Sequence, residues 1–242
     1  MKTLLFITLI LNLSIFADYS IHKDSEKVID ELVIKHGFER AYVLEVLKDA
    51  KKRKTALSSV ARPAEKTKSW DDYIAIFIKK KRIIDGKRFI KINIDTLERA
   101  EKEFGVPKEI ITAILGVETN FGNNMGSYRV IDSLTTLGFD DPRRSKFFRS
   151  ELIQLFLLTR ENNLDILKIK GSYAGAMGYS QFISSSYRAY AIDYDGDGYV
   201  DLFNSIEDAI GSIANYLKRH GWKKEGKIVV QTFPNNVRKF YK

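Results

Sequence analysis

Hydrophobic residues recur at helical spacing along most of this chain. The first apolar stripe consists of Val28, Ile29, Leu32 and Val33. Residues three and four positions apart share one face of an α-helix, so this stripe predicts an amphipathic helix. The pattern stops at Gly37, a residue suited to a helix C-cap, and resumes from Ala41 to about Lys52. The two stripes predict a helical hairpin near the start of the chain.

Further helical patterns follow, separated by turn signals. Residues 94–105 are amphipathic and end at Gly105. Residues 107–119 begin with proline and are apolar on all sides, which predicts a helix buried by its neighbours. Residues 55–69 lack a clear period, which is typical of a linker or surface loop. Strand-like alternation is scarce, with one short strand expected in residues 227–242, so the pattern predicts a mainly α fold.

The apolar run from Leu4 to Phe16 differs from these helices, because it follows Lys2 and precedes the small residue Ala17. This arrangement is typical of a secretory signal peptide, here residues 1–17, and the run is short for a bilayer span. An uncleaved membrane anchor is the alternative. No other long apolar run follows, so we expect no stable membrane anchor after cleavage. The absence of cysteine excludes disulfides and a lipoprotein anchor on cysteine.

The composition adds that the chain is basic and able to bury a sizeable core. It is 44% hydrophobic, which suits one domain with a subdomain or two small domains. Its formal net charge is +9. Removal of the signal peptide would remove the single positive charge of Lys2. The positive charge of an exported protein is compatible with binding to anionic polymers such as cell wall, lipopolysaccharide, anionic lipid or nucleic acid. Charge alone does not choose among these partners.

One carboxylate stands out against the apolar pattern. Glu118 lies near the end of the segment 107–119, and the turn sequence "NFGNN" follows at once. A carboxyl in an apolar site has its charged form disfavoured, so its pKa rises and it can donate a proton near neutral pH. This is the general-acid role in glycosidic cleavage. By spacing alone, a glutamate before a helix-ending glycine is more often a solvated or capping residue.

The surroundings of Glu118 indicate more than its spacing does. Four blocks occur in this order: "GVETNFG", "DDPRRSKFF", "GSYAGAMGYSQF" and "GDGYVDL…DAIGSIANYLKRHGW". Together they resemble the lytic murein transglycosylase B family of periplasmic enzymes, and the resemblance covers residues 26–233. It implies a lysozyme-like helical core at residues 105–242, preceded by an N-terminal helical subdomain and linker at residues 18–104.

The resemblance also implies a chemistry. In that family, the glutamate matching Glu118 protonates the oxygen between N-acetylmuramic acid and N-acetylglucosamine, and then acts as base toward the muramoyl C6 hydroxyl. That hydroxyl attacks its own anomeric carbon, so the product is a 1,6-anhydro sugar and water is not consumed. One carboxyl suffices because the nucleophile belongs to the substrate. Asp132, Asp140 and Asp141 lie downstream, so hydrolysis with a paired acid stays open.

The composition of the segment "GSYAGAMGYSQF" is suited to a surface on which a sugar chain binds. Its glycines and alanines remove side-chain bulk, so a glycan can lie close to the backbone. By resemblance, Ser172 and Gln181 line the cleavage site and Tyr179 lines a neighbouring subsite. Tight helix packing is the other reading of the small residues. Ser184 stands where the family usually has proline, which we expect to alter a turn more than the chemistry.

Four further residues match family positions near the glycan. Arg143 and Arg144 match positions that contact the glycan or its anionic peptide stem, to which a guanidinium is suited. A solvated helix end is the alternative for this pair. Tyr73 and Tyr216 match aromatic residues near the groove, with core packing as the alternative.

A second candidate site is the acidic loop, residues 193–208. Its candidate ligands are Asp193, Asp195, Asp197, Tyr199 through its backbone carbonyl, and Asp208. The first four stand at positions one, three, five and seven of an EF-hand-like loop. Position twelve is Asn204 rather than glutamate, and the resemblance places the closing carboxylate at Asp208. We expect a structural Ca²⁺ that substitutes for the absent disulfides, with a solvated acidic turn as the alternative.

The sequence thus predicts a peptidoglycan lytic transglycosylase located in the periplasm. We expect a monomer that binds peptidoglycan glycan strands and no nucleic acid, and that needs no organic cofactor. The alternatives are a non-catalytic peptidoglycan-binding or scaffolding protein on the same fold, a hydrolytic muramidase, and a calcium-regulated interaction module.

Overall fold

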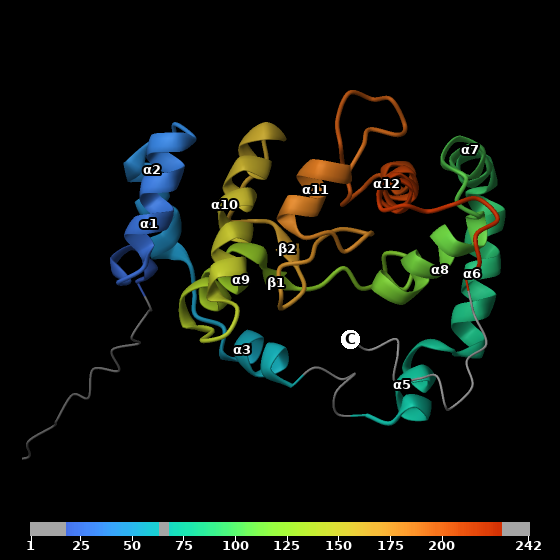
Figure 1. The fold of residues 1–242 in the computed structure, drawn as a ribbon, viewed down its shortest axis with the longest axis horizontal. Coiled ribbons are helices and arrows are strands. Elements are labelled where there is room, and N and C mark those ends of the chain that lie inside the picture. Colours follow the sequence, from blue (N-terminus) through green and yellow to red (C-terminus); the bar gives the residue numbers. More distant parts are fainter. Residues whose placement is uncertain (1–17, 63–67, 229–242) are drawn as a thin grey trace, which may run out of the picture.

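The computed structural model describes residues 18–62 and 68–228, which are mainly helical. The prediction of a mainly α fold is confirmed (Figure 1). The signal peptide expected at residues 1–17 and the tail beyond residue 228, where a strand was expected, lie outside the described residues. Within the described ranges, no helix combines the length and the apolar character needed to cross a membrane.

The first helices form one end of the molecule (Figure 1). They are the 3₁₀ turn η1 (Tyr19–Ile21), α1 (Ser25–Asp30), the π-helical turn η2 (Glu31–Lys35), α2 (Arg40–Asp49) and α3 (Lys54–Ala61). Gly37, with a φ of 66°, separates η2 from α2, and the helical hairpin is confirmed. The interpretation of residues 55–69 as a linker or loop is wrong for residues 55–61. There, α3 packs against α9 (Val130–Asp140) and buries Ala56 completely.

Three helices form the opposite end: α5 (Trp70–Phe77), α6 (Lys80–Ile92) and α7 (Ile94–Phe104). The Ser69 hydroxyl caps α5 by accepting the backbone N–H of Asp72 at 3.2 Å. As expected, α7 ends at a left-handed Gly105. α6 packs against α8 (Lys108–Thr119), and α7 packs against α12 (Ile206–Arg219). The helices of residues 18–104 therefore lie at two ends of the molecule, and a domain boundary at residue 104 stays a prediction.

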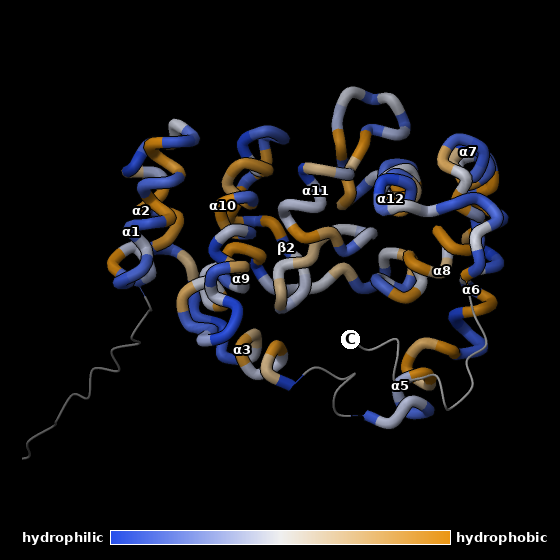
Figure 2. The backbone as a smooth tube through the Cα atoms, in the orientation of Figure 1, coloured by the Kyte–Doolittle hydropathy of each residue, from blue (hydrophilic) through white to orange (hydrophobic). Residues whose placement is uncertain are grey.

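The core lies between these two ends, around α8, α9 and α10 (Ser145–Glu161). All ten residues from Val130 to Phe139 of α9 are buried, and α9 packs along α10. Figure 2 shows hydrophobic segments on α8, α9 and α10, whereas α7 at the edge is largely hydrophilic. Two strands, β1 (Tyr128–Arg129) and β2 (Lys170–Gly171), pair antiparallel beside α9. The sequence pattern did not predict them, because two residues are too few to show alternation.

The prediction that the helix α8 is buried on all sides is wrong for one of its faces, which is exposed. Ala113, Val117 and Glu118 are exposed, whereas Ile111 and Leu115 on the other face are fully buried. The neighbours α6, α7 and α12 cover α8 only in part. The end of α8 that carries Glu118 therefore borders solvent, beside the short helix α11 (Ser184–Tyr190) and α12.

Candidate active site

The backbone turns in an unusual way directly after Glu118. Asn120, Phe121 and Gly122 have φ values of 52°, 59° and 86°, all in the left-handed region. Such values are common at helix ends for glycine or asparagine but uncommon for a phenylalanine. The ring of Phe121 packs against Gly116, where a Cβ atom would lie 2.8 Å from the ring carbon Cζ. The chain thus folds back onto the helix that carries the acid.

Thr119 fixes this turn to the loop that follows β2. Its hydroxyl accepts the backbone N–H of Gly122 at 2.9 Å and donates to the carbonyl of Tyr179 at 3.1 Å. The ring of Tyr179 lies against Gly122, where a Cβ atom would approach a ring carbon to 2.0 Å. Only glycine fits at residue 122 in this packing. The end of α8 and the segment "GYSQF" are therefore joined next to Glu118.

Glu118 lines a pocket of about 390 Å³ between α8, residues 180–183, α11 and α12. The lining residues are Ile114, Glu118, Ser180, Gln181, Phe182, Ile183, Ser186, Ile213, Tyr216 and Leu217. A mostly apolar wall with a few convergent polar groups is typical of ligand pockets of this size.

The surroundings of Glu118 raise the pKa of its carboxyl. Its side chain is exposed along the pocket opening, so it is less buried than the sequence suggested. The surrounding protein still removes enough water to raise the pKa of Glu118, and desolvation is the cause of this shift. Among the described residues, the pocket holds no other carboxylate and no cation that would pair with Glu118. A carboxyl in this state can hold a proton and give it to a bound oxygen.

None of the three aspartates considered as a partner for Glu118 lines its pocket. Asp132 is fully buried, and its carboxylate binds Arg53 and Arg129, each at 2.6 Å. Asp140 and Asp141 accept hydrogen bonds from the Tyr19 hydroxyl and the backbone N–H of Arg143, respectively. These carboxylates stabilise the fold around α9 and lie outside the candidate site.

Two of the predicted substrate residues, Gln181 and Tyr216, lie in the pocket with Glu118. Gln181 has a φ of 48°, and its Nε2 donates to the carbonyls of Met125 and Gly178 at 3.1 and 3.0 Å. These contacts orient its side-chain amide.

The other predicted residues do not line this pocket. Ser172 accepts the backbone N–H groups of Ala174 and Ala176 at 3.3 and 3.1 Å, and so shapes its own loop. Tyr179 packs at the end of α8, as described above. Arg143, Arg144 and Tyr73 contact their local neighbours: Arg144 stacks on Phe147 at 4.5 Å, and Tyr73 packs on Phe77 at 5.2 Å. Their roles toward substrate stay predictions.

Seven of the ten residues that line this pocket were not singled out from the sequence: Ile114, Ser180, Phe182, Ile183, Ser186, Ile213 and Leu217. Ile213 and Leu217 could have been found, because they lie three and four positions from each other or from Tyr216 on one helix face. Nothing in the sequence marks Ser186, which lies in α11 and lines the pocket opposite α8.

The comparison with known proteins decides the family. The family model described as Transglycosylase SLT domain matches residues 20–241. The chain belongs to this family. Membrane-bound lytic murein transglycosylase B of Escherichia coli (strain K12) is 41% identical over 222 residues, which are 88% of this chain and 61% of that protein. The chain thus spans less than two thirds of the length of this relative.

Solved structures agree with the family assignment. Soluble lytic transglycosylase SltB1 from Pseudomonas aeruginosa is 48% identical, with a TM-score of 0.79 over 83% of this chain and 68% of that one. Escherichia coli lytic transglycosylase Slt35 in complex with calcium is 42% identical, with a TM-score of 0.81 over 87% and 67%. SltB3 from Pseudomonas aeruginosa in complex with NAG-anhNAM-pentapeptide is 27% identical, with a TM-score of 0.71 over 84% and 54%. The lysozyme-like fold expected from the sequence is confirmed.

The acidic loop of this SLT-domain protein gathers three carboxylates. Oxygen atoms of Asp193, Asp195 and Asp197 lie within 4.8 Å of one another. Asp193 also accepts the backbone N–H groups of Gly196 and Gly198 at 2.7 and 2.8 Å, which curls the loop around the cluster. Three close, largely exposed carboxylates repel one another, and oxygen donors of this kind suit a hard divalent cation. The donor set therefore fits Ca²⁺.

Asp208 has a different place in this loop. It is buried, and its carboxylate accepts the backbone N–H groups of Tyr194, Asp195 and Asp201 at 2.7, 3.3 and 2.7 Å. It lies outside the group of three carboxylates that approach one another. Asp208 thus holds both arms of the loop to the start of α12, and its role as a metal ligand stays a prediction, as does that of the Tyr199 carbonyl.

Proposed function

We propose that this protein is a peptidoglycan lytic transglycosylase with Glu118 as its catalytic acid and base. The observation that carries the proposal is a single carboxylate with a raised pKa in a pocket whose described lining holds no second carboxylate. A hydrolase with paired carboxyls needs a second group to activate water or to attack the sugar. Membership of the SLT-domain family and the likeness to lytic murein transglycosylase B point to murein as the substrate.

The proposed reaction moves one proton out and one proton back. Glu118 donates its proton to the oxygen between N-acetylmuramic acid and N-acetylglucosamine, and the C1–O bond breaks. The C6 hydroxyl of the same muramoyl unit then attacks C1 and gives its proton to the Glu118 carboxylate. The products are a glycan ending in 1,6-anhydro-N-acetylmuramic acid and a released N-acetylglucosamine end. Glu118 returns to its protonated form, and no water is consumed.

The proposed substrate contacts are supported by the pocket lining. In this proposal Gln181 and Tyr216, which line the pocket with Glu118, border the reacting bond and offer an oriented amide and an aromatic face. Ser172 is also assigned to the cleavage site, Tyr179 to a neighbouring subsite and Tyr73 to the groove, and contacts with the glycan or its peptide stem are assigned to Arg143 and Arg144. The complex of SltB3 with NAG-anhNAM-pentapeptide supports a glycan of this chemistry as ligand.

Product analysis tests the reaction. Purified protein is incubated with murein sacculi, and the released fragments are examined by mass spectrometry. We expect muropeptides that end in anhydro-N-acetylmuramic acid, which are lighter by one water than the hydrolytic products. Reducing muramic acid ends alone would identify a muramidase instead. Binding to sacculi without any released fragment would favour the non-catalytic scaffold.

We also propose a structural Ca²⁺ held by Asp193, Asp195 and Asp197, with Tyr199 and Asp208 completing the loop. The close approach of the three carboxylates and the calcium complex of Slt35 support this assignment.

A ligand that binds only the folded state raises stability by about 2.7 kcal/mol at a hundred times its Kd. Thermal unfolding should therefore shift upward with CaCl₂ and downward with chelator. Asp195→Asn should lose this response and Asp165→Asn, outside the loop, should keep it; an unchanged melting curve in wild type would contradict the site.

The proposed place of action is the periplasm, and the proposed state is a monomer. The N-terminal segment expected to be a signal peptide supports export, whereas the E. coli relative is described as membrane-bound. Fractionation of cells that produce the full chain distinguishes periplasmic from membrane material. Light scattering of the purified protein measures its mass.

A further inference from the structure

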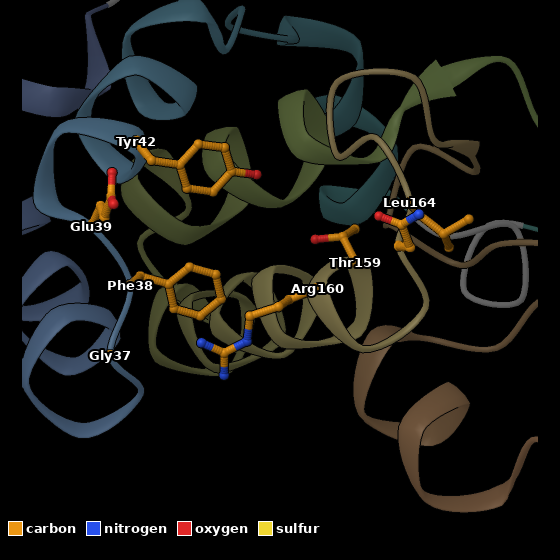
Figure 3. A pocket seen from close by; sticks show the side chains of 8 residues that line it. Gly37, Phe38, Glu39, Tyr42, Thr159, Arg160 and Leu164 are labelled. Atoms are coloured by element: carbon orange, nitrogen blue, oxygen red, sulfur yellow. The ribbon is translucent and has the colours of Figure 1, made fainter.

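A recess separate from the catalytic pocket lies between α2 and the end of α10 (Figure 3). It has a volume of about 450 Å³ and shares no lining residue with the Glu118 pocket. The residues used below are Phe38, Glu39, Tyr42, Arg160 and Asn163. Nothing in the proposed reaction uses any of them.

The floor of the recess is an aromatic stack held in place by the core. Phe38 and Tyr42 lie parallel, with ring centroids 6.3 Å apart and an interplanar angle of 12°. Both rings pack edge-on against the fully buried Phe156, at 5.7 and 6.1 Å. Phe38 is 9% exposed, whereas Tyr42 is 39% exposed. The outer ring is therefore accessible yet fixed in orientation, so little side-chain entropy would be lost when a ligand stacks on it.

Arg160 supplies a cation in a fixed place beside this stack. Its guanidinium carbon lies 4.1 Å from the centroid of Phe38, and its Nη1 donates to the carbonyl of His36 at 2.6 Å. A guanidinium carries five N–H donors. Arg160 forms no ion pair within the described residues, in contrast to Arg53, Arg129 and Arg188. A planar fork of N–H donors therefore remains for a carboxylate or another oxygen acceptor.

The rim adds hydrogen-bonding groups of the opposite kind. Glu39 precedes α2 and is exposed, and no ion pair within the described residues engages it. Asn163 is exposed in the turn after α10, with a φ of 51°. A carboxylate accepts from sugar hydroxyls, an amide both donates and accepts, and the C–H face of a pyranose suits the negative face of an aromatic ring. A purely apolar partner would leave these polar groups unpaired.

We propose that this recess binds an N-acetylated amino sugar that bears a carboxylate-containing substituent, as in a muropeptide, outside the catalytic pocket. The sugar ring stacks on Tyr42, the carboxylate binds Arg160, and Glu39 and Asn163 bind hydroxyl or acetamido groups. The choice of a muropeptide rests on the proposed function. A second glycan contact would hold the enzyme on an insoluble wall while the catalytic pocket releases one product and accepts the next bond.

Backbone amide shifts of ¹⁵N-labelled Glu118→Gln protein test the recess. The probe is a purified disaccharide-tetrapeptide, and neutral tri-N-acetylchitotriose is the comparison. Signals of Gly37, Asn163 and Leu164 report the recess, and those of Ser180 and Ser186 report the catalytic pocket. We expect the muropeptide to shift both groups in one titration, and the neutral oligosaccharide to bind the recess roughly tenfold more weakly, because it lacks the carboxylate.

Variants decide whether the named side chains are responsible. Added to Glu118→Gln, Arg160→Ala and Tyr42→Ala should each weaken binding at the recess by about tenfold or more. Lys146→Ala on the same helix removes the same charge and should leave recess binding unchanged. Absence of recess shifts at saturation of the pocket, or equal affinity in all variants, would overturn the proposal. Shifts in the recess without shifts in the catalytic pocket would support the recess as a binding site and count against the proposed function. Shifts in the pocket without shifts in the recess would support the proposed function and overturn the recess proposal.

Discussion

Two carboxylates in this molecule have opposite surroundings. Asp132 is fully buried in α9, and Glu118 is exposed along a pocket at the end of α8. Burial alone would raise the pKa of Asp132, but hydrogen bonds from Arg129, the Lys51 backbone and Arg53 outweigh it and hold that pKa below its ordinary value. Glu118 has no such partners among the described residues, so the loss of water alone raises its pKa. The comparison shows that hydrogen-bond and ion-pair partners, rather than burial, decide whether the pKa of a carboxyl in this fold is lowered or raised.

The largest effect expected is the loss of activity in Glu118→Gln. Removing a general acid lowers rates by roughly a hundredfold to ten-thousandfold, and Gln keeps the shape of the side chain. Glu118 has no ion-pair partner among the described residues, so the melting temperature should stay nearly unchanged or rise slightly. Release of anhydromuropeptides from sacculi measures the first effect, and thermal unfolding the second. Retained turnover in this variant would place the acid elsewhere.

Asp132→Asn should lower the free energy of unfolding and leave the activity of the folded protein unchanged. Breaking a buried ion pair from one side costs about 3–5 kcal/mol, because the remaining charges lose their compensation. Urea unfolding should show this loss, while the refolded fraction keeps its specific activity. Asp49→Asn is a matched control, since Asp49 is an exposed partner of the same Arg129 and should cost less than about 1 kcal/mol. Equal losses for the two variants would contradict a special role for the buried aspartate.

The two carboxylates should also affect different quantities as the pH changes: Glu118 should set the pH dependence of activity, and Asp132 that of stability. Activity needs protonated Glu118, so kcat/KM should fall as pH rises through a pKa above the ordinary glutamate value of about 4.3. The folded-state pKa of Asp132 is lowered, so its stabilisation is complete above the unfolded pKa of about 3.9 and is lost as pH falls through the folded pKa. A pH–rate profile measures the first, and urea midpoints of wild type and Asp132→Asn measure the second. An alkaline limb at the ordinary glutamate value would refute the raised pKa of Glu118.

A smaller effect is expected at Thr119, which is buried next to Glu118 and does not line the pocket. Thr119→Val loses hydrogen bonds to Gly122 and Tyr179. We expect kcat to fall by roughly tenfold through misplacement of the acid, with KM nearly unchanged. Thr119→Ser keeps the hydroxyl and should restore most of kcat. Steady-state kinetics on a soluble glycan measures both, and equal defects in the two variants would indicate packing of the methyl group as the cause.

Much of this molecule could be predicted from the sequence, because local signals set its helices. The stripes at residues 28–33 and 94–105, with their closing glycines, give the helices and their ends. Other features depend on contacts between distant residues. The helix at residues 54–61 packs on α9 and buries Ala56, and the two-residue strands are defined by their pairing.

The same distinction applies to the candidate site. Glu118, Gln181 and Tyr216 were found from their motifs, and the structure places all three in one pocket. The exposure of Glu118 was missed, because the apolar sequence of α8 does not tell which of its faces remains uncovered. Ser186 was missed because its place in the pocket depends on tertiary packing, which no local pattern in the sequence encodes. Motifs therefore supplied the chemistry, and tertiary packing supplied the surroundings of each group.

The left-handed turn at residues 120–122 has a consequence for the order of events in folding. A helix of the length of α8 is only marginally stable alone. Phe121 folds back over Gly116, and the hydroxyl of Thr119 donates to the carbonyl of Tyr179, about sixty residues later. Glu118 therefore acquires its geometry only after residues 177–182 have been made, so a chain still emerging from the ribosome carries Glu118 without its proposed site. The proposed activity would be absent until the end of α8 and this segment have met.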